Sequence, residues 1–521
     1  MKPLVRSLLA SALILAAGSV SAQTLRIGYA DPVSSLDPEL NNYAGDRSVA
    51  LHAFESLVNR HDDKTLPGLA KSWKVLDDKT WEFALRDDVK WQDGTPLTAD
   101  DFVFSFERSR AVPGSVASYA GAMRTVESVQ AKDDHTLIIK TRSPNANLLP
   151  DVDSIYVVSR HVGATAASAD YNSGKAMVGT GPYRFVSYVP GDRTIFERNK
   201  EYWGEKPLWD SVDYRFIANA ASRTAALLAG DVDVIDKVSP TDVARLRQSE
   251  NVKVYAYSGL RALLIQPSFR AGPNEYIRDN AGKTLEQNPL LDVRVRKALS
   301  LAINRPAIVE RIMQGTVTEA NQWMPANTFG YNPELKNIAY DPTAAKALLK
   351  DAGFPEGFQL TVHVPGDRYP QAPEAMQAVA QFWSRIGVKV QLEVLPWAVY
   401  AGKANKNELA ISVIAWGNGT GEAAYALTNI LTTVDSAKGQ GASNWGHYSN
   451  PLVDQALVKA TAEFDEAKRR AILQDSAKVV ADDVGIIPLF HYQNIWAARK
   501  GLKVEPLVSD RTAATMVTEL P

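Results

Sequence analysis

Two glycine loops are the first segments whose spacing suggests ligand chemistry. Residues 282–284 (GKT) match the end of a phosphate-binding loop, but Ile277 stands where the first glycine of that loop is required. Residues 417–422 begin like a dinucleotide loop, but Glu422 takes the place of the last glycine. Because a glycine loop after a strand lets a ligand approach backbone N–H groups, the second loop predicts ligand binding without a dinucleotide.

Patterns typical of catalysis do not occur in the sequence. The seven histidines include no His-Glu-x-x-His pair, and no two of them lie within five residues of each other. There is no Gly-x-Ser-x-Gly elbow, and the absence of cysteine excludes thiol nucleophiles, cysteine–zinc sites and iron–sulfur clusters. We therefore expect no enzyme, no metal site and no cofactor, although a hidden carboxylate pair stays open.

The tryptophans are the more informative aromatic residues. Those within residues 73–91 lie in a β-rich segment, where core packing is the simplest interpretation. Trp397, Trp416 and Trp445 lie near predicted strand ends or in loops that contain glycine and asparagine. Loops at strand ends are where α/β proteins bind ligands, and aromatic walls suit an extended amphipathic solute. Packing between loops is the alternative for each of the three.

Length and charge restrict the class of protein. A chain of 521 residues is too long for one hydrophobic core and predicts about three domains. Lys and Arg number 57 and Asp and Glu 59; without Lys2 and Arg6 of the first 22 residues the balance is 55 minus 59, or −4. This balance argues against a general nucleic-acid binder.

The N-terminus predicts export. Lys2 and Arg6 precede an apolar run at residues 8–17, and residues 20–22 (VSA) offer a cleavage site before Gln23. No cysteine follows for lipid attachment, and no later segment approaches 18 uncharged apolar residues. We expect residues 1–22 to be a signal peptide and the mature protein to be periplasmic and soluble, without a lipid anchor.

Hydrophobic periodicity predicts two α/β regions with a β-rich insert between them. A strand at 25–29 leads into a bent, exposed loop, and alternation at 81–86 predicts a half-buried strand, with Thr98 capping the helix that follows. The first α/β region combines strand 212–217, helix 220–229 and strand 232–235. This βαβ unit implies parallel pairing, and a further strand is expected at 252–257.

The second α/β region lies more than 100 residues further along the chain. Asp341 caps a helix that ends at Gly353, and strand 358–364, helix 374–386 and strand 388–394 follow. Two separate regions of this kind, together with the insert, predict two lobes and an additional subdomain.

Several segments, in this order and spacing, resemble the periplasmic solute-binding proteins of family 5, the dipeptide/oligopeptide/nickel class that serves ABC importers. The resemblance covers nearly all of the mature chain. Its most specific part runs through residues 69–73 (LAKSW), 81–86 (WEFALR) and 89–102 (VKWQDGTPLTADDF). The remaining segments are 35–38 (SLDP), 179–183 (GTGPY), 292–305 (DVRVRKALSLAINR), 340–342 (YDP) and 448–451 (YSNP).

The resemblance implies an α/β clamshell of the type II-like periplasmic-binding-protein fold, with an extra β-rich subdomain on one lobe. The expected lobe I comprises residues 23–52, 179–267 and 490–521, the subdomain 53–178, and lobe II 268–489. Such a protein encloses one solute between its lobes, is monomeric, and docks on a membrane permease driven by ATPase subunits. It performs no covalent chemistry. We expect a small peptide or peptide-like solute.

The resemblance also implies a set of ligand-binding residues. Peptide-binding members carry an aspartate three residues after the equivalent of Trp416, where it pairs with the ligand ammonium; here that position is Gly419. Glu422 is the hypothesised replacement, with Asp31 or Asp37 as other candidates, and Arg368 is a candidate for a ligand carboxylate. The full expected set is Val33, Ser34, Ser35, Arg368, Trp397, Trp416, Gly417, Asn418, Gly419, Glu422 and Trp445.

The sequence leaves open alternative roles for two site residues, alternative solutes and alternative functional classes. The alternative for Glu422 is a structural loop residue, and the alternative for Arg368 is that it holds Asp367 or a carbonyl of its own lobe. A solute without a free amine, such as an opine, a sugar derivative or a nickel complex, would need no acid at Gly419. A secreted hydrolase and an adhesion or chaperone-like protein are the alternatives from other functional classes.

Overall fold

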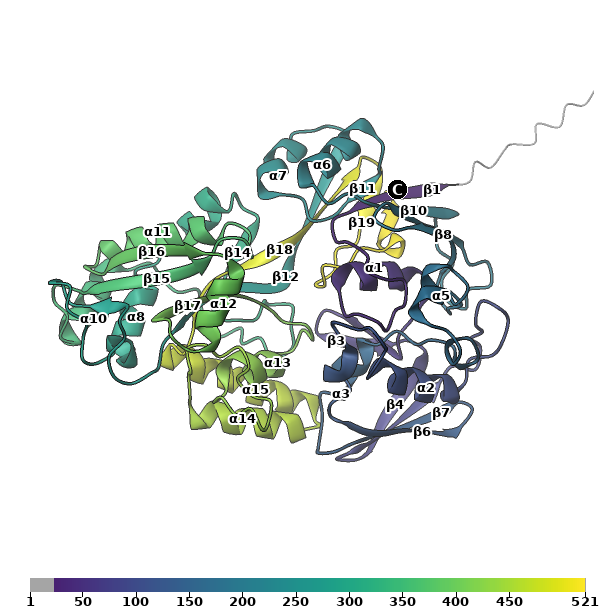
Figure 1. Cartoon of the computed structure of the whole chain (residues 1–521), viewed down its shortest axis with the longest axis horizontal. Coiled ribbons are helices and arrows are strands. Elements are labelled where there is room, and N and C mark those ends of the chain that lie inside the picture. Colours follow the sequence, from purple (N-terminus) through teal and green to yellow (C-terminus); the bar gives the residue numbers. More distant parts are fainter. Residues whose placement is uncertain (1–22, 521) are drawn as a thin grey trace, which may run out of the picture.

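Two long strands join the two halves of the molecule. The structure, a computed structural model, describes residues 23–520, so the predicted signal peptide lies outside the described residues. Strand β12 (Val252–Pro267) leads from the first half into the second, and β18 (Ile487–Arg499) leads back. Figure 1 shows these two strands side by side between the two bodies.

The register in which β12 pairs with β18 shifts where the two strands pass from one half of the molecule to the other. Residues 252–258 pair with 493–499, and residues 262–265 pair with 487–491, with a register shift between Ser258 and Ala262. Gly259 lies in this irregularity, and a Cβ there would come within 2.7 Å of the Asn494 side-chain oxygen. A bulge bends and twists a strand pair, so the link between the halves has a built-in bend.

Lobe I is the half that contains both termini of the described chain. Its sheet continues from β18 in the order β11, β1, β10, β9 and β8, and buried side chains of β1 and β10 form its core with α1. Its elements are β1 (Thr24–Tyr29), α1 (Ala44–Ala53), α4 (Arg160–Gly163), α5 (Ser168–Asn172), β8 (Tyr183–Val189), β9 (Arg193–Arg198), β10 (Ser211–Phe216), α6 (Ala220–Ala229), β11 (Val234–Ile235), α7 (Pro240–Arg247), β19 (Leu502–Val504) and β20 (Val517–Glu519).

The first predicted βαβ unit is confirmed with one correction. Helix α6 has the predicted bounds and ends at Gly230, whose positive φ of 80° suits a glycine. The flanking strands β10 and β11 are parallel to each other, but they do not pair, because β1 lies between them and pairs with both. Strand β1 comes from an earlier part of the chain, so its position between β10 and β11 cannot be predicted from the local hydrophobic periodicity.

The β-rich insert forms a separate layer with its own core. Its four-stranded sheet has the order β4-β5-β7-β6 and is packed by α2, and the tryptophans Trp81 and Trp91 are buried there. Its elements are β2 (Val58–His61), β3 (Lys64–Pro67), β4 (Ala70–Asp77), β5 (Thr80–Leu85), α2 (Ala99–Ser109), β6 (Val126–Asp133), β7 (Thr136–Thr141) and α3 (Leu148–Asp153). We refer to residues 54–158 in this layer as the subdomain.

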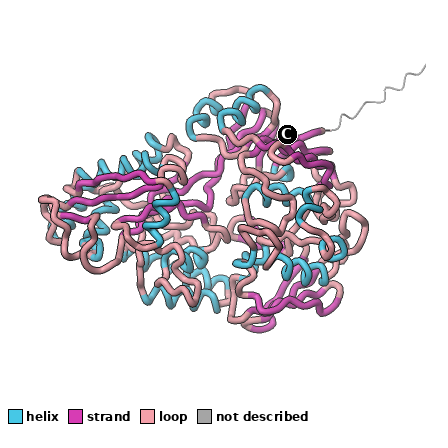
Figure 2. The backbone as a smooth tube through the Cα atoms, viewed as in Figure 1, coloured by secondary structure: helices cyan, strands magenta, loops and turns pink. Residues whose placement is uncertain are grey.

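Lobe II is the other half and has two buried clusters, one on each side of β17. Helices surround its strands, as the cyan segments of Figure 2 show. Its elements are β13 (Ile277–Arg278), α8 (Val293–Leu301), α9 (Arg305–Ala307), β14 (Val317–Glu319), α10 (Pro342–Asp351), β15 (Gln359–Pro365), α11 (Ala372–Ser384), β16 (Lys389–Leu395), α12 (Trp397–Asn405), β17 (Ile411–Gly417), α13 (Ala423–Ala426), α14 (Pro451–Ala462) and α15 (Glu466–Asp483).

The second predicted βαβ unit is confirmed in full. Strands β15 and β16 pair in parallel from Gln359 to Pro365, and α11 connects them. The predicted cap of the preceding helix is also present, because Asp341 Oδ1 accepts a hydrogen bond of 2.8 Å from the backbone N–H of Ala344. The fold is therefore the expected two-lobed α/β clamshell with an additional β-rich subdomain.

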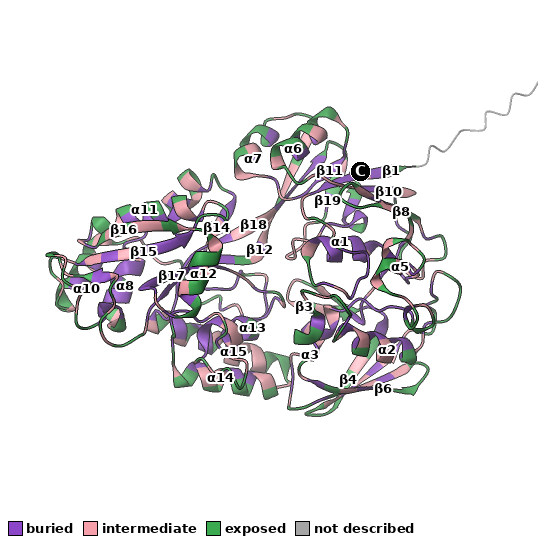
Figure 3. Cartoon of the chain, in the orientation of Figure 1, coloured by how far each residue is buried: buried purple, intermediate pink, exposed green. Residues whose placement is uncertain are grey.

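Burial follows these layers. Figure 3 shows buried residues along β15 and β17 and exposed residues on the outer face of α12. Among the helices of residues 23–520, none combines the length and the apolar character that crossing a membrane requires.

Candidate functional site

Strand β17 ends in the predicted glycine loop, and a buried asparagine holds that loop in shape. The side-chain N–H group of Asn418 donates to the Glu422 carbonyl oxygen at 2.8 Å, and its Oδ1 accepts from the Thr420 backbone N–H at 3.3 Å. The Asn418 backbone N–H donates to the Leu260 carbonyl oxygen at 2.9 Å. The last contact attaches the loop to β12 at the bend between the lobes.

Gly417 allows an arginine of the neighbouring strand to lie against the backbone. A Cβ at this position would be 3.0 Å from Nη2 of Arg261. The guanidinium donates from Nη1 to the Ala415 carbonyl oxygen at 2.9 Å and has no ion-pair partner among residues 23–520. Burial raises the pKa of the Asp510 carboxyl in lobe I, but the positive charges of Lys237 and, second, of Arg261 outweigh it, so that the pKa is lowered. Arg261 is therefore an unpaired cation at the junction of the lobes.

Trp416 and Tyr425 form an aromatic pair beside this loop. Their ring centroids lie 5.8 Å apart with an interplanar angle of 30°. The indole N–H of Trp416 is buried and has no hydrogen-bond partner within the described part of the chain. Gly419 is exposed, and a Cβ built on it would be 3.9 Å from the Tyr425 hydroxyl. A buried donor without an acceptor is uncommon in proteins, and this one lies beside the glycine loop.

Glu422 is already engaged within the protein. Its Oε2 accepts from Arg469 Nη1 at 2.9 Å and its Oε1 from Arg469 Nη2 at 3.2 Å, and only 6% and 11% of the two side chains are exposed. Any ammonium of a ligand would share this carboxylate with a guanidinium. The hypothesis that Glu422 takes the place of an acid at Gly419 stays a prediction.

The loop lies where lobe II meets the subdomain. Arg60 of β2 donates to the Thr420 carbonyl oxygen, and Arg469 donates to Oδ1 of Asn147. Arg470 forms a salt bridge of 3.2 Å with Asp63. These contacts connect α15 and the glycine loop to the subdomain, in agreement with the proximity of α13, α15 and α3 in Figure 1.

Two charged residues of the subdomain face this loop. Asp151 on α3 is half-buried, and burial together with the nearby Glu422 raises the pKa of its carboxyl to about 8. The positive charge of Arg124 counteracts part of that rise. Both residues also influence Tyr425, whose pKa is raised mainly by burial. The groups around the glycine loop therefore come from two parts of the fold.

Trp397, Trp445 and Arg368 form a second group within lobe II. The two indole rings are 6.2 Å apart, and Trp445 Nε1 donates to Asn405 Oδ1 at 2.8 Å. The Arg368 guanidinium lies 5.3 Å from the Trp397 ring centroid and is exposed, with no ion pair in the described chain. The alternative that Arg368 holds Asp367 is wrong, because Asp367 accepts from the Trp397 backbone N–H instead.

The predicted residues of the opening loop belong to lobe I. Ser34 donates from its backbone N–H and its hydroxyl to the two oxygens of Asp46, at 2.6 and 2.5 Å. Ser35 is buried and donates to Asn172 Oδ1 at 3.1 Å, and the Val33 carbonyl oxygen accepts from Tyr188. No hydrogen bond among residues 23–520 connects Val33, Ser34 or Ser35 to lobe II.

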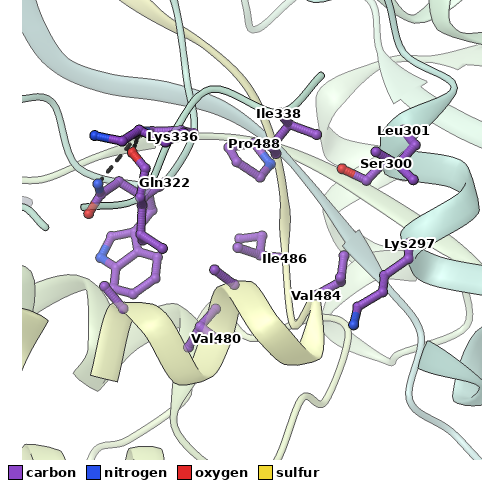
Figure 4. A pocket seen from close by; sticks show the side chains of 15 residues that line it. Lys297, Ser300, Leu301, Gln322, Lys336, Ile338, Val480, Val484, Ile486 and Pro488 are labelled. Atoms are coloured by element: carbon purple, nitrogen blue, oxygen red, sulfur yellow. Dashed lines mark hydrogen bonds between the residues drawn. The ribbon is translucent and has the colours of Figure 1, made fainter. Parts of the chain in front are cut away.

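A cavity of about 230 Å³ lies elsewhere in lobe II. Figure 4 shows it between the end of α8, the C-terminal half of α15 and the beginning of β18. Its lining includes Lys297, Lys336, Val480 and Ile486 and none of the eleven predicted site residues. We therefore place the candidate site at the glycine loop and not in this cavity.

The placement of the histidines and acidic side chains can be compared with that of a metal site. Residues 23–520 contain no group of three or more His, Asp or Glu side chains placed to hold an ion. Of the histidines, His52, His363 and His491 are buried. His52 is packed by its own lobe, with Nε2 accepting from the Ala514 backbone N–H at 3.1 Å.

Sequence reasoning missed the charged residues that approach the loop from outside it. Arg261, Arg124, Asp151 and Arg469 come from four different elements or loops, and none belongs to a recognisable motif. The one available signal was Gly417, because a glycine at a strand end indicates close approach by another group.

Comparisons with known proteins agree on one family. A family model described as bacterial extracellular solute-binding proteins, family 5 Middle, matches residues 64–438. The dipeptide-binding protein of Escherichia coli (strain K12) is 28% identical over 476 residues, which cover 85% of this chain and 84% of the relative. Heme-binding protein A of Haemophilus influenzae is 29% identical over 450 residues, with 82% and 78% covered.

A solved structure has the same fold. HbpA2 from Haemophilus parasuis superposes with a TM-score of 0.83 at 25% identity, covering 96% of this chain and 100% of that one. The family match spans well over half of the 521 residues. This chain therefore belongs to the family 5 bacterial extracellular solute-binding proteins, and its role is to bind a solute between two lobes.

Proposed function

We propose that this protein is the substrate-binding component of an ABC importer and that its solute is a small peptide or peptide-like compound. It acts as a monomer, binds the solute without chemical change, and delivers it to a permease with ATPase subunits. The dipeptide-binding relative supports this solute class, and its match extends over most of both chains. The heme-binding relative indicates that solutes differ within the family.

One observation favours a solute with peptide groups. The buried indole N–H of Trp416 has no acceptor among residues 23–520, and one residue away Gly417 lies beneath the unpaired guanidinium of Arg261. A peptide carbonyl would accept from the indole, and a terminal carboxylate would bind the guanidinium through two parallel hydrogen bonds. Both donors are in place before the solute arrives.

The remaining predicted residues complete the proposed site. Arg368 is an exposed cation over Trp397 and offers a second place for a carboxylate. Trp397 and Trp445 supply apolar surface for a side chain of the solute. Val33, Ser34 and Ser35 belong to lobe I and would contact the solute when the lobes close.

Closure follows from contacts with both lobes. A solute that binds both halves favours the closed arrangement by its difference in affinity between the two states, whereas a solute on one lobe alone does not. The bend at Ser258 to Ala262 is the place where β12 can accommodate this motion.

The proposed location is the periplasm, as a soluble protein without a lipid anchor. The residues that support export, Lys2 and Arg6 with the apolar run at 8–17, precede the described chain.

Thermal unfolding of residues 23–521 tests the proposed function. A pool of di- and tripeptides should raise the melting temperature by a few degrees, since a ligand at 100 times its Kd adds about 2.7 kcal/mol of stability. Arg261→Met should reduce that rise, while Arg385→Met, on a surface of lobe II away from the loop, should not. A rise only with opines, sugar derivatives or nickel complexes would overturn the peptide assignment.

A further inference from the structure

The cavity in lobe II is lined mainly by apolar side chains. Ala477, Val480 and Val484 of α15 lie on one face of that helix and form one wall. Ile486 and Pro488, at the start of β18, continue the wall, as Figure 4 shows. An apolar cavity of about 150 Å³ holds benzene, so a volume of about 230 Å³ holds a chain of about nine non-hydrogen atoms.

The wall at the end of α15 is held in place by an arginine of α8. Val484 has a φ of 46°, which is unfavourable for a β-branched residue. Arg296 donates from Nε to the Val484 carbonyl oxygen at 3.2 Å and from Nη2 to the Asp483 carbonyl oxygen at 2.7 Å. Strained backbone that its neighbours hold in place is concentrated at functional sites. The cavity is therefore formed before a ligand enters it.

One end of the cavity is polar and lies on α8. Lys297, Ser300 and Leu301 line it from one face of the helix. Ser300 is 5% exposed, and its hydroxyl oxygen accepts from Arg305 Nη2 at 3.1 Å. No hydrogen bond within residues 23–520 uses the proton of that hydroxyl, so it is free to donate. Figure 4 shows Lys336 on the opposite side of the cavity.

Two cations at the α8 end have no carboxylate partner. Neither Lys297 nor Arg305 forms a salt bridge within 4 Å among residues 23–520. Arg305 is 1% exposed, and its other hydrogen bonds go to the carbonyl oxygens of Pro488 and Ser300, at 2.8 and 3.1 Å. Burial lowers the pKa of Arg305 to about 10, and Glu319 counteracts only part of that decrease. A buried cation without a countercharge favours an anion nearby.

A loop with few hydrogen bonds covers the other side of the cavity. Asn321 Nδ2 donates to the Leu335 carbonyl oxygen at 2.5 Å, and the Asp341 backbone N–H donates to the Leu301 carbonyl oxygen at 2.9 Å. Between these two points, no backbone N–H group of residues 336–340 donates a hydrogen bond to the described chain. A segment of this kind opens at low cost in free energy, which provides a route for a ligand.

We propose that this cavity binds a medium-chain aliphatic carboxylate, with its chain along α15 and its carboxylate between Lys297 and Ser300. The chain would replace empty volume by apolar contacts. The carboxylate would accept from the Ser300 hydroxyl and the Lys297 ammonium, and it would supply the missing countercharge for Arg305. This inference goes beyond the proposed function, because the protein would hold a second ligand outside the solute site.

Calorimetric titration of the mature wild-type chain at pH 7 compares octanoate with octan-1-ol and butyrate. Octan-1-ol has the chain without the charge and should bind at least about tenfold more weakly. Butyrate has the charge without most of the chain and should bind at least about 30-fold more weakly. Equal affinities for the acid and the alcohol, or no saturable binding of octanoate, would overturn the inference.

Variants locate the binding. Ala477→Leu fills part of the cavity and should weaken octanoate and octan-1-ol alike, at least about tenfold. Lys297→Met should weaken octanoate about fivefold and leave octan-1-ol unchanged. Lys283→Met, whose lysine is 75% exposed and does not line the cavity, is the matched control and should change neither. Unchanged binding in Ala477→Leu, or a loss in Lys336→Met but not in Lys297→Met, would contradict the proposal.

The peptide pool separates this inference from the proposed function. Octanoate and peptides should raise the melting temperature additively, and Ala477→Leu should keep the peptide effect, because the cavity contains no residue of the glycine loop. Competition between the two would place octanoate in the solute site and overturn the inference alone. Octanoate binding without any response to peptides would overturn the proposed function alone. The wild-type comparison of the three probes holds even if Ala477→Leu fails to fold.

Discussion

Glu422 and Arg469 form a two-point ion pair at the place where lobe II meets the subdomain. The two N–O distances are 2.9 and 3.2 Å, and Arg469 extends one further hydrogen bond to Asn147 of the subdomain. The ion pair thus connects the glycine loop of the candidate site to α15 and, through Arg469, to the subdomain. It also explains why a residue that the sequence offers as a ligand contact is engaged before any solute binds.

We expect Glu422→Gln to destabilise the protein strongly. Removing one partner of a buried pair leaves Arg469 uncompensated, which costs about 3–5 kcal/mol. Urea unfolding monitored by tryptophan fluorescence measures the loss. Glu466→Gln is the matched control, since Glu466 is 72% exposed in its pair with Arg470 and should cost less than about 1 kcal/mol. A loss for Glu422→Gln as small as that of the control would contradict the structural role.

Trp416→Phe tests the unpartnered indole N–H. The substitution keeps an aromatic ring beside Tyr425 but removes the donor, so peptide affinity should decrease by about 1–1.5 kcal/mol, roughly tenfold. Calorimetric titration with the most stabilising peptide measures this change. Trp209→Phe is the control, because Trp209 Nε1 donates to the Val517 carbonyl oxygen within lobe I, far along the fold from the loop. Equal affinities for Trp416→Phe and wild type would exclude the indole as a ligand donor.

Gly179→Ala should destabilise the fold through a collision of backbones. A Cβ at Gly179 would be 1.7 Å from the Ala53 carbonyl oxygen, which cannot move without shifting the end of α1. We expect a loss of about 3 kcal/mol or more. Gly402→Ala makes the contrast, since no atom lies within 4 Å of its Cβ position in α12 and helix propensity should add about 0.5–1 kcal/mol. Thermal denaturation should show a lower melting temperature for Gly179→Ala and a higher one for Gly402→Ala. A change in the same direction for both variants would refute the explanation.

His52 should make the protein less stable in acid. Its ring is fully buried, stacks at 4.9 Å on Phe196, and has its pKa lowered by burial to about 4. The unfolded chain takes up a proton near pH 6.5 and the folded one only near pH 4, so stability falls as pH decreases through this window. The loss by pH 4 is about 3 kcal/mol. His52→Asn should flatten the stability curve between pH 6.5 and 4, and the exposed His135→Asn should not. An unchanged slope in His52→Asn would show that other groups cause the acid sensitivity.

Local elements were predictable because their causes are local. Helix α6 ends at Gly230 and α10 begins after Asp341, as capping chemistry requires. The β15–α11–β16 unit follows from alternation and helical periodicity within 40 residues. The order of β10, β1 and β11 was not predictable in this way, since β1 enters from nearly 200 residues earlier in the chain.

The sequence by itself determined the family, the α/β class and the glycine loop after β17, because each depends on residues that are neighbours in the chain. Only the tertiary structure decided which charges meet at that loop. Arg261 lies on β12, Arg469 on α15 and Asp151 on α3, and long-range pairing, not spacing in the sequence, brings them near residues 417–422. Electrostatic partnership depends on distance through space, so pairing Glu422 with Arg469 and leaving Asp151 unpaired is a property of the fold and not of any motif.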